Sequence, residues 1–290
     1  MLIGIIKSLR IKQWIKNGFI FAGIIFDRQL FYYPAFLKTA LGFMIFCFLS
    51  SAVYFINDIF DIEADKQHPK KRYRPIASGI IPIKTAIGIA LLLCTISLSS
   101  AYFLSINFFA LCTLYFSMNL LYSKWLKHIP ILDVMIIASG FVLRVGAGVS
   151  LIHVERFSPW LYVVTTLISL FIGFGKRRAE LVLLSEGANH HRIVFEGYSL
   201  PLLDQLITIV SSITLVSYSL YSFSAPNLPE NHSMMLTIPF VLYGIFRYLY
   251  LIQADQAAGA PEELVLKDRP LQISILLYGI SVVIIFYFLK

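Results

Sequence analysis

Between two long apolar runs, residues 57–79 (NDIFDIEADKQHPKKRYRPIASG) gather acidic side chains and then basic ones. The acids are Asp58, Asp61, Glu63 and Asp65. On a helix, Asp58, Asp61 and Asp65 would stand at positions i, i+3 and i+7 and share one face. Three carboxylates on one face repel each other unless a cation joins them, and Mg²⁺ usually binds one or two carboxylates plus substrate phosphates. The pattern therefore predicts a magnesium site that acts on a phosphorylated substrate.

The basic run that follows the acids suits the phosphates of such a substrate. It consists of Lys70, Lys71, Arg72 and Arg74, and lysine and arginine are the side chains that bind phosphate groups. The alternative is a solvated, charged loop between two membrane helices. The shared face of the aspartates favours the metal-and-phosphate interpretation, because a loop without function has no reason to align its carboxylates.

The composition indicates a membrane protein. Of the 290 residues, 58% are hydrophobic and only 14% are charged, which is outside the range of ordinary soluble domains. Apolar runs near the length that crosses a bilayer recur along the chain. The cysteines, Cys47, Cys94 and Cys112, fall inside these runs without metal-like spacing, so we interpret them as small apolar residues.

The hydropathy pattern predicts an all-α, multi-pass protein with about nine transmembrane helices in a single domain, residues 1–290. An amphipathic start, residues 1–12, would lie in the membrane interface. The predicted spans are residues 13–30, 34–56, 83–104, 108–122, 131–152, 159–175, 202–224, 234–253 and 271–289.

Basic residues set the predicted orientation. They cluster at the N-terminus and after the second, fourth, sixth and eighth spans, and the other side holds only Arg28, Lys38, Arg156 and Lys290. Because positive residues stay in the cytoplasm, we expect a cytoplasmic N-terminus and a C-terminus outside the inner (plasma) membrane. This distribution explains the net charge of +8 without nucleic acid as a partner. The loops on the cytoplasmic side also hold nearly every acid, which predicts a cytoplasmic active site that opens sideways to lipid.

Several stretches carry a family resemblance. NDIFDIEAD (residues 57–65) matches the NDxxDxxxD signature of the UbiA superfamily of membrane prenyltransferases, and the resemblance covers nearly the whole chain. Three more stretches resemble the decaprenyl-phosphate phosphoribosyltransferase branch. They are LRIKQWIKN (residues 9–17), in which Ile11 replaces the proline of the branch, YSKWLKHIPILDVMIIASGFVLR (residues 122–144) and GKRRAEL (residues 175–181). GKRRAEL lies where other superfamily members carry a second Asp-rich motif, so it offers cations in place of acids.

The resemblance implies a UbiA-like bundle that transfers 5-phosphoribose from phosphoribosyl diphosphate to a polyprenyl phosphate and releases pyrophosphate. Mg²⁺ on Asp58 and Asp61, helped by Asn57 and Asp65, would neutralise the donor, and Arg72 or Arg74 would stabilise the leaving group. The acceptor phosphate is already anionic, so it needs positioning rather than a strong base. Its lipid tail would lie between helices and leave through the bilayer.

The candidate site residues fall into three groups. The catalytic candidates are Asp58, Asp61, Arg74, Lys176 and Arg177, and the metal-ligand candidates are Asp58, Asp61 and Asp65. The substrate-binding candidates are Lys12, Lys16, Asn17, Asn57, Arg72, Tyr122, Lys127, Asp133, Arg144, Arg178 and Glu180.

For several candidates the sequence leaves a structural alternative open. Arg144 could bind substrate or a structural acceptor inside the membrane. Tyr122 could donate to a phosphate or belong to the interfacial aromatic belt. Glu180 could bind a ribose hydroxyl or pair with Lys176 four residues earlier. In the last cytoplasmic loop, Asp268 and its neighbour Arg269 could contact substrate or cap a helix.

Two rival functions are compatible with the sequence. An ordinary UbiA-type prenyltransferase would move a prenyl group from its diphosphate to an aromatic or lipid acceptor, and would differ at residues 175–181. A transporter is compatible with nine helices and buried charges, yet its path needs polar groups near the midplane, whereas these charges gather on one face. The acceptor chain length, a homo-oligomeric state and the pathway that uses the product, with cell-wall biosynthesis among the candidates, stay open.

Overall fold

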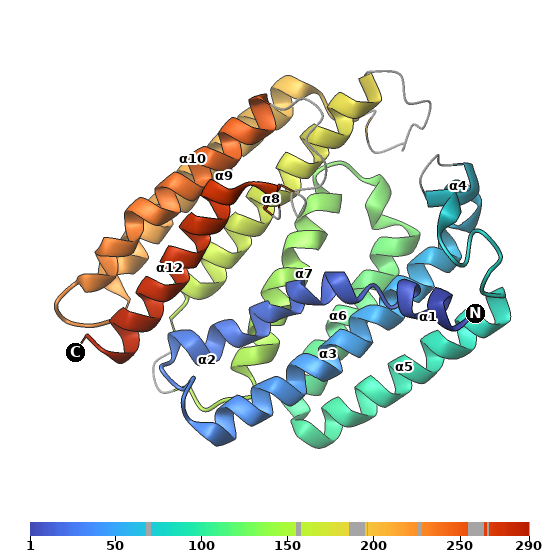
Figure 1. Ribbon diagram of the computed structural model, residues 1–290, viewed down its shortest axis with the longest axis horizontal. Coiled ribbons are helices and arrows are strands. Elements are labelled where there is room, and N and C mark those ends of the chain that lie inside the picture. The colour runs from blue at the N-terminus through green and yellow to red at the C-terminus, as the bar shows by residue number, and fades with distance from the viewer. Residues whose placement is uncertain are drawn as a thin grey trace. The chain divides into compact units, whose positions relative to one another are not determined.

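The computed structural model describes residues 1–67, 71–154, 158–185, 195, 197–225, 228–254, 264–265 and 267–289. Within these ranges every regular element is a helix (Figure 1). Lys70, Arg156 and Lys290, which entered the predictions above, lie outside the described residues.

The long helices are α3 (Tyr33–Phe60), α5 (Ile83–Leu104), α6 (Ile106–Lys124), α7 (Leu132–Val149), α8 (Trp160–Ser185), α9 (Leu200–Ser224), α10 (Ile238–Ala254) and α12 (Arg269–Tyr287). The shorter α-helices are α1 (Leu2–Ser8), α2 (Ala22–Phe26) and α4 (Ile62–Gln67). The 3₁₀ helices are η1 (Ile11–Phe21), η2 (Lys71–Tyr73), η3 (Leu126–His128) and η5 (Ser233–Thr237).

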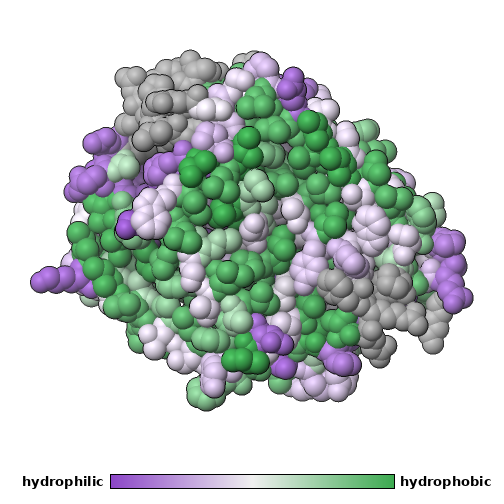
Figure 2. Space-filling model, turned by 180° about the vertical axis from the view of Figure 1, so that it is seen from behind, coloured by the Kyte–Doolittle hydropathy of each residue, from purple (hydrophilic) through white to green (hydrophobic). Residues whose placement is uncertain are grey.

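The chain is an integral membrane protein. Seven of the described helices are long and apolar enough to cross a bilayer, namely α3, α5, α6, α7, α9, η5 with α10, and α12. Large hydrophobic side chains such as Phe103, which is 85% exposed, lie on the surface, and green hydrophobic residues cover much of the face in Figure 2. A soluble monomer rarely exposes so much apolar surface, whereas lipid accommodates it.

The predicted count of nine spans is not confirmed. The first predicted span is the 3₁₀ helix η1 followed by the short helix α2. The sixth is α8, which continues ten residues beyond the predicted end and carries Lys176, Arg177 and Arg178 within the helix. The other predicted spans correspond to described helices, and α5 has the predicted bounds, residues 83–104.

The described chain packs as two compact units, the first of which comprises residues 1–25, 29–127 and 140–154. Its helices α3 and α5 lie side by side (Figure 1), and Phe46, Leu49 and Phe108 form part of its core. The helix η1 packs closely on α7, because a Cβ atom at Gly148 would lie 1.9 Å from the carbonyl oxygen of Ile20. Only glycine allows this approach, which fixes η1 against the part of α7 in this unit.

The second unit comprises residues 26–28, 128–139 and 155–290. Its core includes Phe171, Leu203 and Tyr248 of α8, α9 and α10. The helix α12 begins after Asp268, whose carboxylate accepts a hydrogen bond from the backbone N–H of Leu271 and thereby caps the helix. Each unit therefore has its own core, and the single domain expected from the sequence stays a prediction.

Candidate active site

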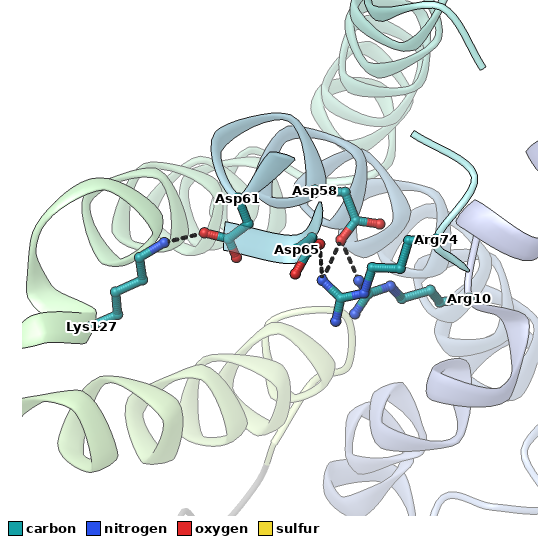
Figure 3. A network of polar contacts seen from close by, with 6 residues as sticks. All are labelled: Arg10, Asp58, Asp61, Asp65, Arg74 and Lys127. Carbon is teal, nitrogen blue, oxygen red and sulfur yellow. Dashed lines mark hydrogen bonds and ion pairs between the residues drawn. The ribbon is translucent and has the colours of Figure 1, made fainter. Parts of the chain in front are cut away.

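The acidic segment is not one continuous helix. The helix α3 ends at Phe60, Asp61 has the backbone angles φ −92° and ψ 5°, and α4 begins at Ile62. Asp58 and Asp65 therefore converge on one arginine, whereas Asp61 faces Lys127 (Figure 3). The single helical face expected from the sequence becomes two adjacent acidic positions, because the helix breaks between the first and third aspartates.

Arg74 joins the two buried aspartates. Its Nη1 donates to Oδ1 of Asp58 at 3.1 Å and to Oδ2 of Asp65 at 2.7 Å. Arg10, which precedes η1, donates from Nη2 to the same Oδ1 of Asp58. Its guanidinium also lies over the ring of Tyr54, with 4.8 Å between Cζ and the ring centroid. Two guanidinium groups thus compensate two carboxylates through charge-assisted hydrogen bonds.

The third aspartate has its own cation. Nζ of Lys127, in η3, lies 2.5 Å from Oδ1 of Asp61. The acids and cations differ in exposure, since the side chains of Asp58 and Asp65 are 3% and 4% exposed and that of Arg74 is 25% exposed. The cations therefore form the layer nearer to solvent, above the two buried carboxylates.

The QWIKN segment is anchored along α3. Nε1 of Trp14 donates to Oγ of Ser51 at 3.0 Å, and the amide of Asn17 donates to Oγ of Ser50 at 3.1 Å. A 3₁₀ helix of eleven residues is unusually long, and these contacts supply bonds that hold it. Asn17 is buried and serves this packing, so its predicted contact with substrate stays a prediction.

Arg144 lies inside the first unit and is buried. Its Nε donates to Oδ1 of Asn17 at 2.8 Å, its Nη1 to the carbonyl of Gly140 at 2.7 Å, and its Nη2 to the hydroxyl of Tyr115 at 2.9 Å. These neutral acceptors correspond to the structural alternative that the sequence left open for this arginine. A direct contact with substrate stays a prediction.

The remaining candidates of the first unit lie on η1, α3, η2 and α6. They are Lys12, exposed; Lys16, Asn57 and Tyr122, half-buried; and Arg72, exposed. Arg72 donates to the hydroxyl of its neighbour Tyr73 at 2.7 Å and lies over the same ring. Arg74 and Lys127 are thus the predicted cations that the structure brings to the aspartates.

In the second unit, Arg177 joins two carboxylates. Its Nε donates to Oδ2 of Asp133 at 2.6 Å, and its Nη1 pairs with Glu180 one turn further along α8. Asp133 is fully buried and Arg177 is 3% exposed, whereas the side chain of Glu180 is 32% exposed. The cation that the sequence predicts for a phosphate is therefore held from the inner side by Asp133 and from the outer side by Glu180.

Tyr198 completes this network. Its hydroxyl donates to Oδ1 of Asp133 at 2.6 Å and accepts from the backbone N–H of Ile131 at 2.6 Å. Ile131 has φ +67°, a conformation that β-branched residues rarely adopt, so the tyrosine supports a strained start of α7. Burial, followed by the hydrogen bond to Asp133, raises the pKa of the Tyr198 phenol well above its usual value.

The two other cations of GKRRAEL differ from Arg177. Arg178 donates from Nε to Oδ1 of Asp204 at 2.6 Å and from Nη1 to the carbonyl of Ile252 at 2.8 Å, which ties α8 to α9 and α10. Lys176 is half-buried on α8. The structure thus assigns packing contacts to Arg178, and the phosphate contacts expected for these two residues stay predictions.

Comparison with known proteins identifies the family. The model of the UbiA prenyltransferase family matches residues 18–179, more than half of the chain. The chain belongs to the UbiA prenyltransferase family. It is 36% identical over 287 residues to the decaprenyl-phosphate phosphoribosyltransferase of Mycolicibacterium smegmatis, covering 93% of this chain and 88% of that protein. It is 32% identical over 289 residues to the same enzyme of Corynebacterium glutamicum, covering 98% and 87%.

The fold of this UbiA family member agrees with a solved structure. The UbiA homologue from Archaeoglobus fulgidus, solved bound to GPP and Mg²⁺, superposes with a TM-score of 0.75 at 18% identity and covers 97% of this chain and 99% of that one. The likeness confirms the predicted all-α UbiA fold.

The Asp-rich segment of this UbiA protein fits a divalent cation. Among the described residues, no three His, Cys, Asp or Glu side chains form a metal site by themselves. Asp58 and Asp65 nevertheless already share one positive group, Nη1 of Arg74. Carboxylate oxygens are the donors that Mg²⁺ prefers, and substrate phosphates usually complete its shell.

Sequence reasoning missed two residues of these networks. Arg10 was counted only as part of the basic N-terminus, although it lies in the LRIKQWIKN stretch that carries the family resemblance. Tyr198 follows a segment without hydropathic periodicity, and its partner Asp133 lies 65 residues away. The motif around Arg10 could have pointed to this residue, whereas nothing in the sequence points to Tyr198.

Proposed function

We propose that this chain is a membrane phosphoribosyltransferase that moves 5-phosphoribose from phosphoribosyl diphosphate to a polyprenyl phosphate. An oxygen of the acceptor phosphate bonds to the anomeric carbon of the ribose, the bond from that carbon to the diphosphate breaks, and pyrophosphate leaves. The acceptor oxygen is already anionic, so no base has to remove a proton. The site therefore needs positioning and charge stabilisation above all.

The observation that carries this proposal is the extent of the similarity to decaprenyl-phosphate phosphoribosyltransferases. It reaches 32% and 36% identity in the two relatives and covers 98% and 93% of the chain. The basic stretch GKRRAEL supports the same conclusion, because two phosphorylated substrates need more cations than a prenyl diphosphate and an aromatic acceptor do.

In this proposal Asp58, Asp61 and Asp65 would hold Mg²⁺, which would supply positive charge for the diphosphate of the donor and for the leaving group. Asn57, which lies next to Asp58 near the end of α3, would help to hold the ion. Arg74, which already contacts the carboxylates, stabilises the leaving pyrophosphate. Arg72 can also bind the pyrophosphate once its hydrogen bond to Tyr73 is broken.

The other cations that are candidates for the phosphates of the two substrates are Lys12, Lys16, Lys127, Lys176, Arg177 and Arg178. Tyr122 and Arg144 stay candidates for phosphate or ribose contacts. Arg177 has to exchange one carboxylate for the phosphate. Glu180 is the one that can leave, because it is partly exposed, whereas Asp133 is fully buried. A freed Glu180 is then available to a ribose hydroxyl.

A second candidate function is transfer of a prenyl group from its diphosphate to an aromatic or lipid acceptor. The observation in its favour is the fold, because the Archaeoglobus fulgidus homologue was solved with GPP and Mg²⁺. That likeness at 18% identity concerns the fold alone, so it favours prenyl transfer less than the full-length relatives favour phosphoribosyl transfer.

Donor choice by the purified protein separates the two functions. The full chain in detergent is offered labelled phosphoribosyl diphosphate with polyprenyl phosphates of several lengths, and in parallel a prenyl diphosphate with an aromatic acceptor. We expect label to pass from phosphoribosyl diphosphate to the lipid in the presence of Mg²⁺. A chelator should abolish this transfer, and added Mg²⁺ should restore it. Prenyl transfer without consumption of phosphoribosyl diphosphate would refute the proposal and leave the family and the fold.

A further inference from the structure

The aspartate cluster of the free protein is already neutralised by the chain itself. Three carboxylates, those of Asp58, Asp61 and Asp65, are paired with three cations, those of Arg10, Arg74 and Lys127. A divalent cation that enters alone would meet Arg10 and Arg74 before the two buried acids, Asp58 and Asp65. It would also have to break charge-assisted bonds to Asp58 and Asp65, which are buried, without replacing them by other anions.

The arrangement differs for an anion. Arg10 and Arg74 are more exposed than the buried pair Asp58 and Asp65, with side-chain exposures of 24% and 25%, whereas Lys127 and Asp61 are exposed to a similar degree, 20% and 18%. Arg10 and Arg74 both donate to one oxygen atom, Oδ1 of Asp58. Two guanidinium groups on one oxygen repel each other, and a diphosphate above them offers several acceptor oxygens in exchange. The anion is therefore drawn to the cations, while the bare metal is not drawn to the acids.

We propose that Arg10, Arg74 and Lys127 exchange partners when the donor binds. In the free protein they neutralise the aspartates, and in the complex they bind the diphosphate, so that the freed carboxylates of Asp58, Asp61 and Asp65 accept the divalent cation. Metal and diphosphate consequently bind as one unit, and each binds weakly without the other. This inference rests on the diphosphate donor of the proposed function, which the rival prenyl transfer shares, and it adds Arg10 to the groups that bind the donor.

Substitution of Arg10 distinguishes the proposed exchange of partners from a purely structural role of this residue. It is supported on both sides, by Asp58 and by the ring of Tyr54, and its backbone has φ +52° at the start of η1. Its replacement by a neutral side chain frees Oδ1 of Asp58 from one of two cations. A bare divalent cation should then bind more tightly, whereas pyrophosphate should bind less tightly. A residue that only stabilised the fold would weaken both.

The test measures Mn²⁺ binding to the full chain in detergent, by electron paramagnetic resonance, with and without pyrophosphate. Mn²⁺ replaces Mg²⁺ as a probe because both prefer octahedral oxygen sites. We expect pyrophosphate to tighten Mn²⁺ binding by about tenfold or more, within the usual range of coupling between sites. In Arg10→Gln the affinity for Mn²⁺ alone should rise and the effect of pyrophosphate should shrink. Lys127→Gln, which frees Asp61 without touching η1, should change both quantities in the same directions.

Lys66→Gln is the matched control, because it removes the same charge from the same region. Lys66 pairs with Glu63 on the exposed side of α4, at 2.8 Å, and touches none of the three aspartates. It should leave both affinities near those of the unmodified protein. Equal Mn²⁺ affinity with and without pyrophosphate in the unmodified protein would overturn the proposal. Loss of bare Mn²⁺ binding in both Arg10→Gln and Lys127→Gln would also overturn it. Donor choice is measured separately, so these outcomes and a failure of the proposed function remain distinguishable.

Discussion

Two aspartates of one motif contribute differently to the fold. Asp58 is buried under two guanidinium groups, whereas Asp61 faces one lysine at a more exposed position. We expect Asp58→Asn and Asp61→Asn both to abolish turnover, because both carboxylates hold the metal in the proposed function. Asp58→Asn should also lower the free energy of unfolding by about 1–3 kcal/mol, the usual cost of weakened buried hydrogen bonds to charged groups.

Asp61→Asn should cost less, about 1 kcal/mol of unfolding free energy, because Asp61 pairs with one cation rather than two and is 18% exposed. Turnover and thermal unfolding of both variants in the same detergent check this pair of expectations. Activity of either variant near that of the unmodified protein would argue against the metal role. An equal loss of stability in both variants would show that the difference in burial between Asp58 and Asp61 does not affect the free energy of unfolding.

Arg177 and Asp133 form the most buried ion pair described in the second unit. Arg177→Ala leaves the carboxylate of Asp133 without its cation, and breaking a buried pair costs about 3–5 kcal/mol of unfolding free energy. Arg178→Ala should cost less, about 1–2 kcal/mol, because its partner Asp204 is 45% exposed and the main further loss is the hydrogen bond to the carbonyl of Ile252. Thermal unfolding of the two variants checks the ranking.

A double variant separates the structural role of Arg177 from phosphate binding. Asp133→Asn combined with Arg177→Gln removes both charges and should recover most of the lost stability, since neutral replacements of buried pairs are often tolerated. If Arg177 also binds a substrate phosphate, the KM for phosphoribosyl diphosphate or for the polyprenyl phosphate should stay high in this stable protein, and added Mg²⁺ should not lower it. Restored kinetics would leave Arg177 with a structural role alone.

At the scale of elements, an ion pair between Arg247 of α10 and Asp268, the N-cap of α12, joins these two helices. Nη2 of Arg247 lies 2.8 Å from Oδ2 of Asp268. This hydrogen bond, with that from the N–H of Leu271, holds the pKa of Asp268 below its ordinary value of 3.8. A carboxyl with a lowered pKa stabilises the fold above the unfolded value and loses that contribution as pH falls through the folded value.

Unfolding in acid therefore tests this ion pair. Asp268→Ala should lower the free energy of unfolding by about 1–2 kcal/mol at neutral pH, since a helix cap is lost. The difference from the unmodified protein should shrink as pH falls below about 4, where the aspartate becomes protonated. Ser199→Ala, which removes the cap of α9, is the control and should show a loss that pH does not change. A loss of unfolding free energy in Asp268→Ala that does not change with pH would contradict a contribution from the ion pair with Arg247.

The sequence predicted elements well where hydropathy and chain breakers coincide. The bounds of α5 follow from a largely apolar run between Pro82 and Ser105. Prediction from the sequence was wrong where tertiary contacts decide the local structure. The end of α8 was placed too early because three cations resemble a loop, yet Arg177 is neutralised inside the helix by Asp133 and Glu180.

For the candidate site, the residue types were predictable and most of their partners were not. The Asp-rich motif and the basic run after it are adjacent in sequence, so the contact of Arg74 with Asp58 could be anticipated. The contacts of Arg10 with Asp58 and of Lys127 with Asp61 join residues 48 and 66 positions apart. Such contacts depend on how η1 and η3 pack, which composition and periodicity do not encode.

At the scale of the whole molecule, the charges predict one orientation in the membrane. The N-terminus and the loop after α3 carry clustered lysines and arginines and should lie in the cytoplasm, whereas the C-terminus should lie outside. The connection between α9 and η5 should then face outwards. The proposed donor, phosphoribosyl diphosphate, is charged and does not cross a bilayer unaided, so the aspartate cluster has to face the compartment that supplies the donor.

Single cysteines test this orientation in intact cells. In a background with Cys47, Cys94 and Cys112 replaced by alanine, Lys66→Cys reports on α4 and Glu230→Cys reports on the connection after α9, and both side chains are exposed. A membrane-impermeant maleimide should label Glu230→Cys and spare Lys66→Cys until the membrane is permeabilised. Reporter fusions at the two ends of the chain provide an independent check. Labelling of both cysteines from outside, or fusions that place both ends on one side, would contradict the predicted topology and would remove the cytoplasmic donor's access to the aspartates.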